Sequence, residues 1–516
     1  MGPSPSAAAP GGKVRTLREL RTLAHQLRLA GRRVVQAHGT FDLLHIGHVR
    51  HLEAARRLGD ALVVTVTADR FVNKGPGRPV FGEHMRAEML AALACVDAVA
   101  INESVDAVEA IEAIRPAVYV KGQDYRDPDS DVTGKIALER AAVEAHGGQL
   151  HLTDEESLSS SELINRHLST FEPHIRDHLA ALRADGALGE ILALIDRVKG
   201  YRVLVVGDAI IDEYRYVMPM AKSPKENVIA TRYQEQETFA GGVFAAANHV
   251  ASFCAEVDVI SCFGALDDQE SFVRRSLRSN VHLHAMTRPS APTTLKQRFV
   301  DSSNMRKLFE VYFMDDAPLV PPLQDELDAR IARTARDYDV VIVTDFGHGL
   351  IGPSTIETLI AHARFLAINT QSNSANLGYN LVTKYGKADY VCIDAPEARL
   401  ALHDRMSSIG DIAHRLSAEH VACDKIIITQ GKHGCTTFER GRIAHQIPAF
   451  ALNVVDTIGA GDAFLAITAP LVAAGGSMRH IGFVGNVVGA LMVEIVGHRR
   501  SVDKPALVKA ITGLLK

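Results

Sequence analysis

A ten-residue stretch, Gly39–His48 (GTFDLLHIGH), constrains the fold of the first third of this 516-residue chain. An apolar run at Val34 and Val35 precedes it and indicates a strand, and helical spacing follows over residues 49–58. The stretch is therefore a strand-to-helix turn. Such a turn directs backbone N–H groups and the positive end of a helix dipole toward an anion.

Two histidines and a glycine give this turn its candidate chemistry. Gly47 lets a phosphate approach the backbone closely. The imidazoles of His45 and His48 can donate hydrogen bonds to phosphate oxygens as charge develops in a transition state. The alternative interpretation is a buried strand end with two incidental histidines.

Strand and helix patterns alternate around this turn. Strands are expected at 60–67, 98–101 and 117–120, and helices at 15–29, 83–94 and 107–114. This alternation predicts an α/β domain with a doubly wound parallel sheet. His45, His48 and Lys121 all fall at the carboxyl ends of strands, where such sheets bind ligands.

The Gly39–His48 run resembles the signature of the HxGH nucleotidyltransferases. Its residues are most similar to the motifs of cytidylyltransferases and heptose-phosphate adenylyltransferases. The resemblance covers roughly residues 31–168. It implies a direct displacement, in which a substrate phosphate oxygen attacks the α-phosphorus of an NTP and pyrophosphate leaves. It also implies Mg²⁺ on the phosphates, and catalytic roles for His45, His48 and Lys121.

The same resemblance implies a set of phosphate contacts. These are Gly39, Thr40, Phe41, Gly47, Lys74, Ser160 and Ser161. Lys74 lies on a loop rich in Gly and Pro, and the serines begin a helix, where serine is also an ordinary N-cap. Arg78 and Arg86 are weaker candidates, and Asp42 is interpreted as structural.

A second motif, Asp456–Phe464 (DTIGAGDAF), lies near the C-terminus. Gly459 and Gly461 permit a tight turn whose N–H groups can hold phosphate, and a helix begins there. Asp462 can accept a proton from a substrate hydroxyl as that hydroxyl attacks the γ-phosphorus of ATP. The alternative is an ordinary glycine turn with a capping aspartate.

This motif resembles the C-terminal signature of the ribokinase/PfkB carbohydrate kinases, and further matches extend from about residue 200 to residue 514. The resemblance implies a ribokinase-like α/β domain with a small β lid. Its implied nucleotide contacts are Thr429, Gly431, Gly434, Gly459, Ala460, Gly461 and Asn486. Its implied sugar contacts are Asp208, Asp212, Gly241, Gly242, Asn248, Lys296, Arg298 and Asp345.

Two regions depart from the kinase pattern. The family often has Asn-x-x-Glu where this chain has Asp394-Ala-Pro-Glu397, in which Glu397 is the residue expected to hold Mg²⁺ and its waters. Related heptose kinases have an Asp-Pro-Lys run where this chain has a polar run at 368–376 without lysine. The departures concern sugar specificity and leave Asp462 and its glycine turn intact.

Composition limits the remaining possibilities. The net charge of −5 gives no general nucleic-acid or membrane signal, and six scattered cysteines without a CxxC pair fit a cytoplasmic protein. Apolar runs at 463–474 and 484–493 are expected to be core helices. The expected organisation is a disordered tail (1–14), a nucleotidyltransferase domain (15–168), two linking helices (169–199) and a kinase domain (200–516).

Together the two domains resemble the bifunctional heptose-phosphate kinases/adenylyltransferases, with the domain order reversed. The first hypothesis is a sugar kinase that uses ATP, joined to a nucleotidyltransferase that uses ATP or CTP to make an NDP-sugar. The second is a kinase/cytidylyltransferase for a polyol or small hydroxy acid. The third is that one domain is a non-catalytic relic. Small molecules are the expected partners, with a homodimer formed through a lid near Tyr214–Tyr233.

Overall fold

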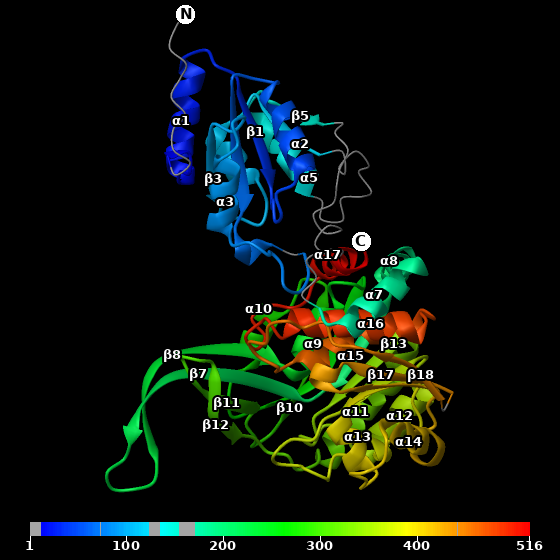
Figure 1. Ribbon diagram of the computed structural model, residues 1–516. Coiled ribbons are helices and arrows are strands. Elements are labelled where there is room, and N and C mark those ends of the chain that lie inside the picture. The colour runs from blue at the N-terminus through cyan, green and yellow to red at the C-terminus, as the bar shows by residue number, and fades with distance from the viewer. Residues whose placement is uncertain (1–11, 73, 123–134, 154–170, 441) are drawn as a thin grey trace, which may run out of the picture. The chain divides into compact units, whose positions relative to one another are not determined.

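The computed structural model describes residues 12–72, 74–122, 135–153, 171–440 and 442–516 (Figure 1). The chain divides after Phe171 into two compact units, and Val508–Leu514 and Lys516 cluster with the first of them. The serine-capped helix start with Ser160 and Ser161, and most of the expected tail, lie outside the described residues.

The first unit is built on a five-stranded parallel sheet in the order β3-β2-β1-β4-β5. Its strands are β1 (Val34–Gly39), β2 (Ala61–Thr67), β3 (Ala98–Asn102), β4 (Val118–Lys121) and β5 (Gln149–Leu152). Its helices are α1 (Leu17–Leu29), α2 (Ile46–Arg56), α3 (Glu83–Ala91), α4 (Val108–Ile114) and α5 (Lys135–Ala145). The doubly wound sheet expected for this domain is confirmed.

Apolar runs in the sequence predicted the inner strands of this sheet. The edge strand β5 has no such run, and the sequence did not predict it. Strands β1 and β2 are buried along almost their whole length, as parallel strands covered on both faces require. The edge strand β5, by contrast, alternates exposed and half-buried residues over only four positions. A pattern that short does not distinguish a strand from a loop.

The second unit contains a nine-stranded sheet in the order β10-β9-β6-β13-β14-β15-β16-β17-β18. Its strands are β6 (Arg202–Gly207), β9 (Glu256–Gly264), β10 (Val281–Arg288), β13 (Val340–Asp345), β14 (Leu366–Thr370), β15 (Tyr390–Asp394), β16 (Lys425–Thr429), β17 (Cys435–Glu439) and β18 (Arg442–Ile447). The strands are parallel from β10 to β16, and β17 and β18 join antiparallel. This is the ribokinase-like α/β architecture that the sequence predicts.

Helices cover both faces of this sheet (Figure 1). One group comprises α9 (Gly242–Val250), α15 (Ala460–Ala473) and α16 (Met478–Met492), and the other comprises α11 (Pro321–Thr334), α12 (Pro353–His362), α13 (Ala395–Ala401) and α14 (Ile409–Arg415). Helix α10 (Glu270–Ser276) follows β9, and α17 (Lys504–Leu515) ends the chain. In the described part of the chain, no helix is long and apolar enough to cross a membrane.

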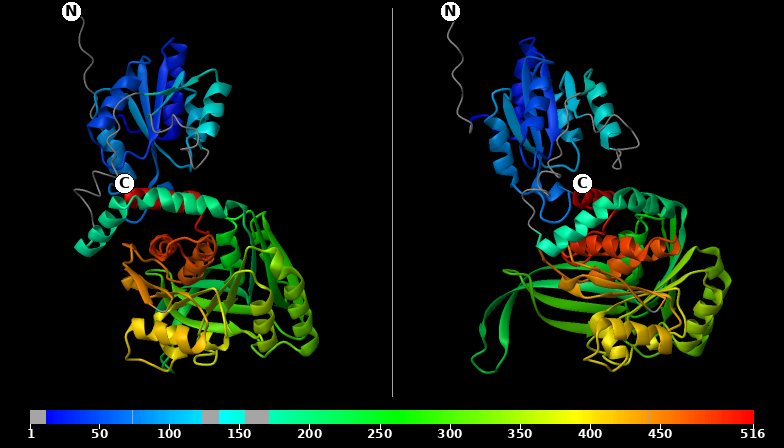
Figure 2. Two further views of the ribbon diagram at one scale, coloured as in Figure 1. Left: turned by 90° about the vertical axis from the view of Figure 1, so that its right-hand side faces the viewer. Right: turned by 45° about the vertical axis from the view of Figure 1, so that its right-hand side comes forward.

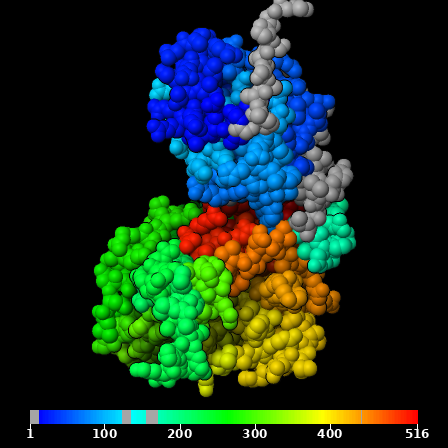
Figure 3. Space-filling view, turned by 60° about the vertical axis from the view of Figure 1, so that its left-hand side comes forward, coloured from blue at the N-terminus to red at the C-terminus, as the bar shows by residue number. Residues whose placement is uncertain are grey.

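A separate four-stranded sheet, in the order β12-β11-β7-β8, forms the expected lid. Its strands are β7 (Ala209–Lys222), β8 (Ile229–Gly241), β11 (Thr294–Asp301) and β12 (Arg306–Phe313). Figure 2 shows the β7–β8 hairpin extending away from the large sheet, and Figure 3 shows the lid side of this unit in green. The lid strands expected near Tyr214–Tyr233 belong to this hairpin.

Two helices, α7 (Pro173–Ala184) and α8 (Ala187–Arg197), occupy most of the segment expected to link the domains. Both helices belong to the second compact unit. The two apolar runs near the C-terminus form α15 and α16, which are buried along most of their length as expected for core helices.

Two glycines of α16 allow a matched test of its packing against α15. A Cβ on Gly485 would lie 2.2 Å from the Phe464 ring, whereas a Cβ on Gly489 would meet nothing within 4 Å. We expect Gly485→Ala to lower the free energy of unfolding by about 1–3 kcal/mol through overpacking. Gly489→Ala should raise it by about 0.4–1 kcal/mol, because alanine loses less backbone entropy on folding. Chemical denaturation followed by circular dichroism measures both changes, and equal effects of the two substitutions would contradict this packing.

Candidate active sites

The helix start of the first unit brings His45 and His48 together. His45 is the N-cap of α2, and its Nδ1 accepts a hydrogen bond from the Gly47 N–H at 3.1 Å. The two imidazole rings stack with their centres 3.9 Å apart. His48 Nδ1 is buried and has no hydrogen-bond partner in the described chain. Since Nδ1 of His45 accepts, its proton in the neutral ring is on Nε2.

Burial keeps this pair of imidazoles neutral. Burial, with smaller contributions from His45 and Lys74, lowers the pKa of His48 to about 3. Burial and then Lys74 also lower the pKa of His45. The pKa of Lys74 itself falls to about 8, chiefly because its ammonium is buried. The predicted residues Lys74, His45 and His48 therefore lie within electrostatic reach of one another, and an anionic ligand would be stabilised by all three.

The residues before the histidines make structural contacts within the unit, and their phosphate contacts stay predictions. The ring of Phe41 is buried in the core and would lie 3.2 Å from a Cβ on Gly39. The carbonyl of Thr40 accepts a hydrogen bond from Arg86. Arg86 is fully buried and also donates to the carbonyls of Phe81 and Thr67, so it organises these turns.

Asp42 is structural, as interpreted from the sequence, because it accepts hydrogen bonds from Arg78 Nε and Val80 N–H, each at 2.6 Å. Arg78, a weaker phosphate candidate, is thereby held by Asp42.

Lys121 lies at the carboxyl end of β4, as predicted, but its ammonium is engaged. Its Nζ lies 2.9 Å from the buried carboxylate of Glu139, which also accepts a hydrogen bond from Tyr119 at 3.0 Å. Lys121 is 7% exposed. In this arrangement Lys121 anchors α5 to the sheet, and its predicted catalytic role requires the ion pair to open.

In the second unit, one cavity of about 320 Å³ gathers most of the predicted kinase residues. The predicted residues that line it are Asp212, Gly242, Lys296, Arg298, Glu397, Thr429, Gly459, Gly461 and Asp462. They come from the lid strands β7 and β11, the end of β16, and the first turns of α9, α13 and α15. The carboxyl edge of the parallel sheet therefore forms the floor of the site, as expected for this topology.

Asp462 occupies the first turn of α15, where Gly459 is the N-cap with φ of +78°. Gln371 Nε2 donates a hydrogen bond to Asp462 Oδ1. Burial raises the pKa of Asp462 to about 6, while His498, Lys296 and Gln371 oppose the rise. A carboxylate with that pKa is ionised at neutral pH and can accept a proton from a hydroxyl.

The lid supplies the charged wall of the cavity. The Arg298 guanidinium donates to Asp212 Oδ1 and, through Nε, to Glu310 at 3.0 Å. Although burial opposes ionisation, Arg298 and His498 hold the pKa of Asp212 below its usual value. Lys296 has no ion-pair partner in the described chain, and its Nζ faces the rings of Tyr312 and Phe346 at 5.4 and 5.7 Å. A buried, unpaired ammonium favours an anionic ligand.

The altered Asp394–Glu397 motif is a capping box. Asp394 Oδ1 accepts from the Glu397 N–H at 2.8 Å, and Glu397 Oε2 accepts from the Asp394 N–H at 3.3 Å. Burial and then the Asp394 carboxylate raise the pKa of Glu397. No cationic side chain in the described residues pairs with either carboxylate. Two half-buried carboxylates without a counter-charge fit a divalent cation brought in with a nucleotide.

Several predicted residues lie outside the cavity lining and make structural contacts. Asn248 bonds to the chain after α10, and Asn486 donates to the carbonyls of Ile447 and Pro448. Gly434 allows the close approach of the Ile447 carbonyl. Gly241 allows the close approach of the Asp212 carboxylate. Gly431 and Ala460 are not in the lining either. Asn248 thus bonds to Ser276 and Arg278 at the end of α10, and its sugar contact stays a prediction.

Asp208 and Asp345 hold the turn after β13 rather than lining the cavity. Asp208 accepts from the backbone N–H groups of Phe346, His348 and Leu350 at 3.0–3.4 Å. Burial and then Asp345 raise the pKa of Asp208 to about 6. Asp345 accepts from the Tyr385 hydroxyl at 2.7 Å and pairs with Lys384.

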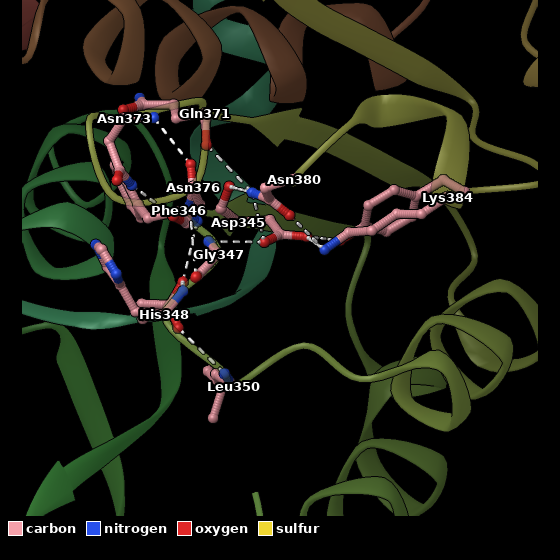
Figure 4. A network of polar contacts seen from close by, with 12 residues as sticks. Asp345, Phe346, Gly347, His348, Leu350, Gln371, Asn373, Asn376, Asn380 and Lys384 are labelled. Carbon is pink, nitrogen blue, oxygen red and sulfur yellow. Dashed lines mark hydrogen bonds and ion pairs between the residues drawn. The ribbon is translucent and has the colours of Figure 1, made fainter. Parts of the chain in front are cut away.

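The polar run that departs from the kinase pattern donates hydrogen bonds to the same turn (Figure 4). Asn373 and Asn376 donate to the Phe346 carbonyl at 3.0 and 2.7 Å, and Asn380 donates to the Asp345 carbonyl at 2.9 Å. Gln371 lies at the start of this run and reaches Asp462. The run therefore connects the turn after β13 to the candidate base.

Comparison with known proteins decides the family. Residues 201–505 match the pfkB family carbohydrate kinases. The chain belongs to the pfkB family of carbohydrate kinases. Ahead of this match, residues 37–166 match the cytidylyltransferase-like family. Both families expected from the motifs are thus confirmed.

Several curated relatives match the N-terminal part of the chain. A bifunctional protein HldE from Syntrophotalea carbinolica is 39% identical over 163 residues, 31% of this chain and 32% of that protein. One from Methylobacillus flagellatus is 43% identical over 169 residues, 32% of this chain and 33% of that protein. The chain thus aligns with about a third of the length of these relatives.

Two solved structures each align with 61% of this chain. A putative ribokinase from Agrobacterium tumefaciens is 20% identical, with 61% of this chain and 99% of that chain covered and a TM-score of 0.49. Phosphofructokinase-2 from Escherichia coli in complex with fructose-6-phosphate is 13% identical, with 61% and 100% covered and a TM-score of 0.49.

Gln371 and His498 are among the residues of the kinase cavity that the motifs missed. Gln371 could have been found from its position, because it lies in the polar run that replaces the Asp-Pro-Lys run of the heptose kinases that the chain resembles. His498 follows Gly497 in a loop after α16 and has no sequence pattern around it. Its place in the cavity is set by folding alone.

The contact between Gln371 and Asp462 generates a pH prediction for the kinase unit. Asp462 accepts protons only when ionised, so turnover should fall as the pH drops through about 6. Gln371→Leu removes a donor that stabilises the carboxylate, so the pKa should rise and the acid limb should move to higher pH, with kcat about tenfold lower. The pH profile of ADP release measures this. Gln446→Leu, at an exposed position on β18, is the control and should leave the profile in place.

Proposed function

We propose that this chain is a bifunctional enzyme that phosphorylates a heptose-like sugar phosphate and joins a sugar 1-phosphate to a nucleotide. The observation that carries the proposal is the single cavity in which Asp462, the Gly459–Gly461 turn and Lys296 face one space. The pairing of a pfkB unit with a cytidylyltransferase-like unit supports the second activity. The bifunctional name of the N-terminal relatives supports the combination.

The kinase step follows from the residues of the cavity. A sugar hydroxyl near Asp462 loses its proton to the carboxylate, its oxygen attacks the γ-phosphorus of ATP, and ADP leaves. The N–H groups at the start of α15 stabilise the charge on the transferred phosphoryl group. The unpaired ammonium of Lys296 favours a substrate that already carries a phosphate.

Mg²⁺ fits this site as the partner of the nucleotide phosphates. Glu397 and Asp394 are the carboxylates that would hold the ion and its waters, since they lack a counter-charge in the described chain. Bound Mg²⁺ neutralises phosphate charge in phosphoryl transfer.

In the first unit, the stacked imidazoles of His45 and His48 and the ammonium of Lys74 act on the triphosphate of a second nucleotide. A phosphate oxygen of the sugar 1-phosphate attacks the α-phosphorus, and pyrophosphate leaves. Nothing in the described histidine site selects ATP over CTP. The chain's own residues position the reactants and stabilise developing charge without a covalent intermediate.

Two substitutions separate the activities. We expect Asp462→Asn to lower the kcat for ADP formation by about 10²–10⁴-fold and to leave pyrophosphate release intact. His48→Ala should lower pyrophosphate release by about 10²–10³-fold and leave ADP formation intact. Each variant is the folding control for the other.

Mass spectrometry of the products, with ATP, CTP, GTP and UTP and a panel of heptose phosphates, other sugars and polyols, measures both reactions. Sugar-dependent ADP formation by Asp462→Asn at the wild-type rate would refute the assignment of the base. A product found only with CTP and a polyol would replace the heptose assignment with the second hypothesis.

We propose that the protein forms a homodimer through the lid sheet. Its strands expose several large apolar side chains, namely Met218, Met220, Ile229, Tyr233, Phe309, Val311 and Phe313. Exposed apolar surface of this kind marks association sites. Tyr233→Glu and Phe309→Glu together should shift the mass measured by light scattering from a dimer to a monomer. The exposed Leu29→Glu, in the first unit, is the control and should leave the mass unchanged. A monomeric wild-type protein would contradict the proposal.

A further inference from the structure

His498 is a buried histidine of the kinase cavity that no motif assigns to a role. Its side chain is 6% exposed and lines the cavity, in the loop that follows α16. Its Nε2 lies 3.3 Å from Asp212 Oδ2. Its Nδ1 is buried and, in the described part of the chain, has no hydrogen-bond partner.

An unsatisfied buried nitrogen calls for an explanation. Leaving such a group without a partner costs about 1–3 kcal/mol, so buried polar atoms are nearly always paired. A cavity-lining atom of this kind is satisfied when a ligand supplies the partner. The position of Nδ1 then indicates which part of the ligand it meets.

His498 lies beside the turn that begins α15. A Cβ on Gly459 would be 2.5 Å from His498 Cε1 and 3.0 Å from Nδ1. Gly459 is the N-cap of α15, where free backbone N–H groups and the helix dipole favour an anion. The neighbouring atom Nδ1 therefore faces the same anion as the helix start.

The contact with Asp212 assigns separate roles to the two ring nitrogens. The ionised Asp212 carboxylate, held by Arg298, accepts the Nε2 proton of His498. In the protonated ring both nitrogens are donors, which leaves the Nδ1 proton for a ligand. The titratable groups that interact with the ring are Asp212 from β7, His249 from α9 and Asp462 from α15, and the cations Lys296 and Arg298 from β11 line the same cavity.

We propose that His498 donates a hydrogen bond from Nδ1 to an oxygen of the phosphoryl group that the kinase site transfers, with Asp212 as its positioning residue. The inference rests on the proposed kinase function and adds a catalytic residue to it. No bond to His498 forms or breaks: its donor stabilises charge on the phosphoryl oxygen alongside the N–H groups of α15. The ligand class is the γ-phosphoryl group of a nucleoside triphosphate.

Two substitutions distinguish the ring nitrogens. Asparagine can place an N–H near the position of Nδ1, and glutamine can place one near Nε2. His498→Gln should therefore keep the contact with Asp212 and lower kcat by about 10²-fold, whereas His498→Asn should stay within about tenfold of wild type. His420→Gln, at an exposed position outside the cavity, is the control. A purely structural role predicts the reverse order, with glutamine tolerated and asparagine not, and that order would overturn the inference.

A second measurement needs no sugar substrate. In protein labelled with ¹³C at histidine Cε1, the His498 signal is the one that His498→Gln lacks. It should move when Mg·AMP-PNP is added and should stay nearly in place with Mg·ADP, because only the former carries a γ-phosphoryl group. A signal that responds equally to both nucleotides, or to neither, overturns the inference. Failure of the wild type to phosphorylate any sugar would instead count against the proposed function alone.

Discussion

The buried ion pair between Asp212 and Arg298 is the interaction on which the kinase cavity depends. It joins β7 to β11 within the lid, and its carboxylate also contacts His498 from the loop after α16. Gly241 permits the close approach, since a Cβ there would lie 2.1 Å from the Asp212 carboxylate. Removing one partner of such a pair leaves a buried charge and typically costs about 3–5 kcal/mol. The lid and the floor of the cavity are therefore held by one charge cluster.

A second network holds the floor from the opposite side. The asparagines of the 373–380 run donate to the turn after β13, whose carboxylate Asp345 is itself bonded to Lys384 and Tyr385 (Figure 4). Gln371, just before these asparagines, donates a hydrogen bond to Asp462. A neutral amide therefore contacts the candidate base from the polar run that replaces the Asp-Pro-Lys run of the heptose kinases that the chain resembles. This explains how the departure from the family pattern is compatible with an intact catalytic motif.

Local sequence patterns predicted most strands and helices of the first unit and about half of the residues that line the kinase cavity. The Gly39–His48 run placed His45 and His48 at a helix start because strand and helix periods change there. The same reasoning placed Lys121 at the end of β4 but did not reveal its ion-pair partner Glu139, which lies on α5, outside any motif. It also did not separate Asp212, which lines the cavity, from Asp208, which binds a backbone turn, because the two lie on one apolar strand pattern only four residues apart.

The sequence by itself determined the two families, the alternation of strands and helices, and the glycine turn that carries Asp462, since each depends on residues close together in the chain. Only the tertiary structure decided that Gln371 and His498 join that aspartate and that Asp394 and Glu397 form a capping box beside it. These groups come from the ends of β14 and β15, the first turns of α13 and α15, and a late loop, and no local spacing records which of these segments meet. Their meeting follows from the strand order of the parallel sheet, which is fixed by burial of the whole core.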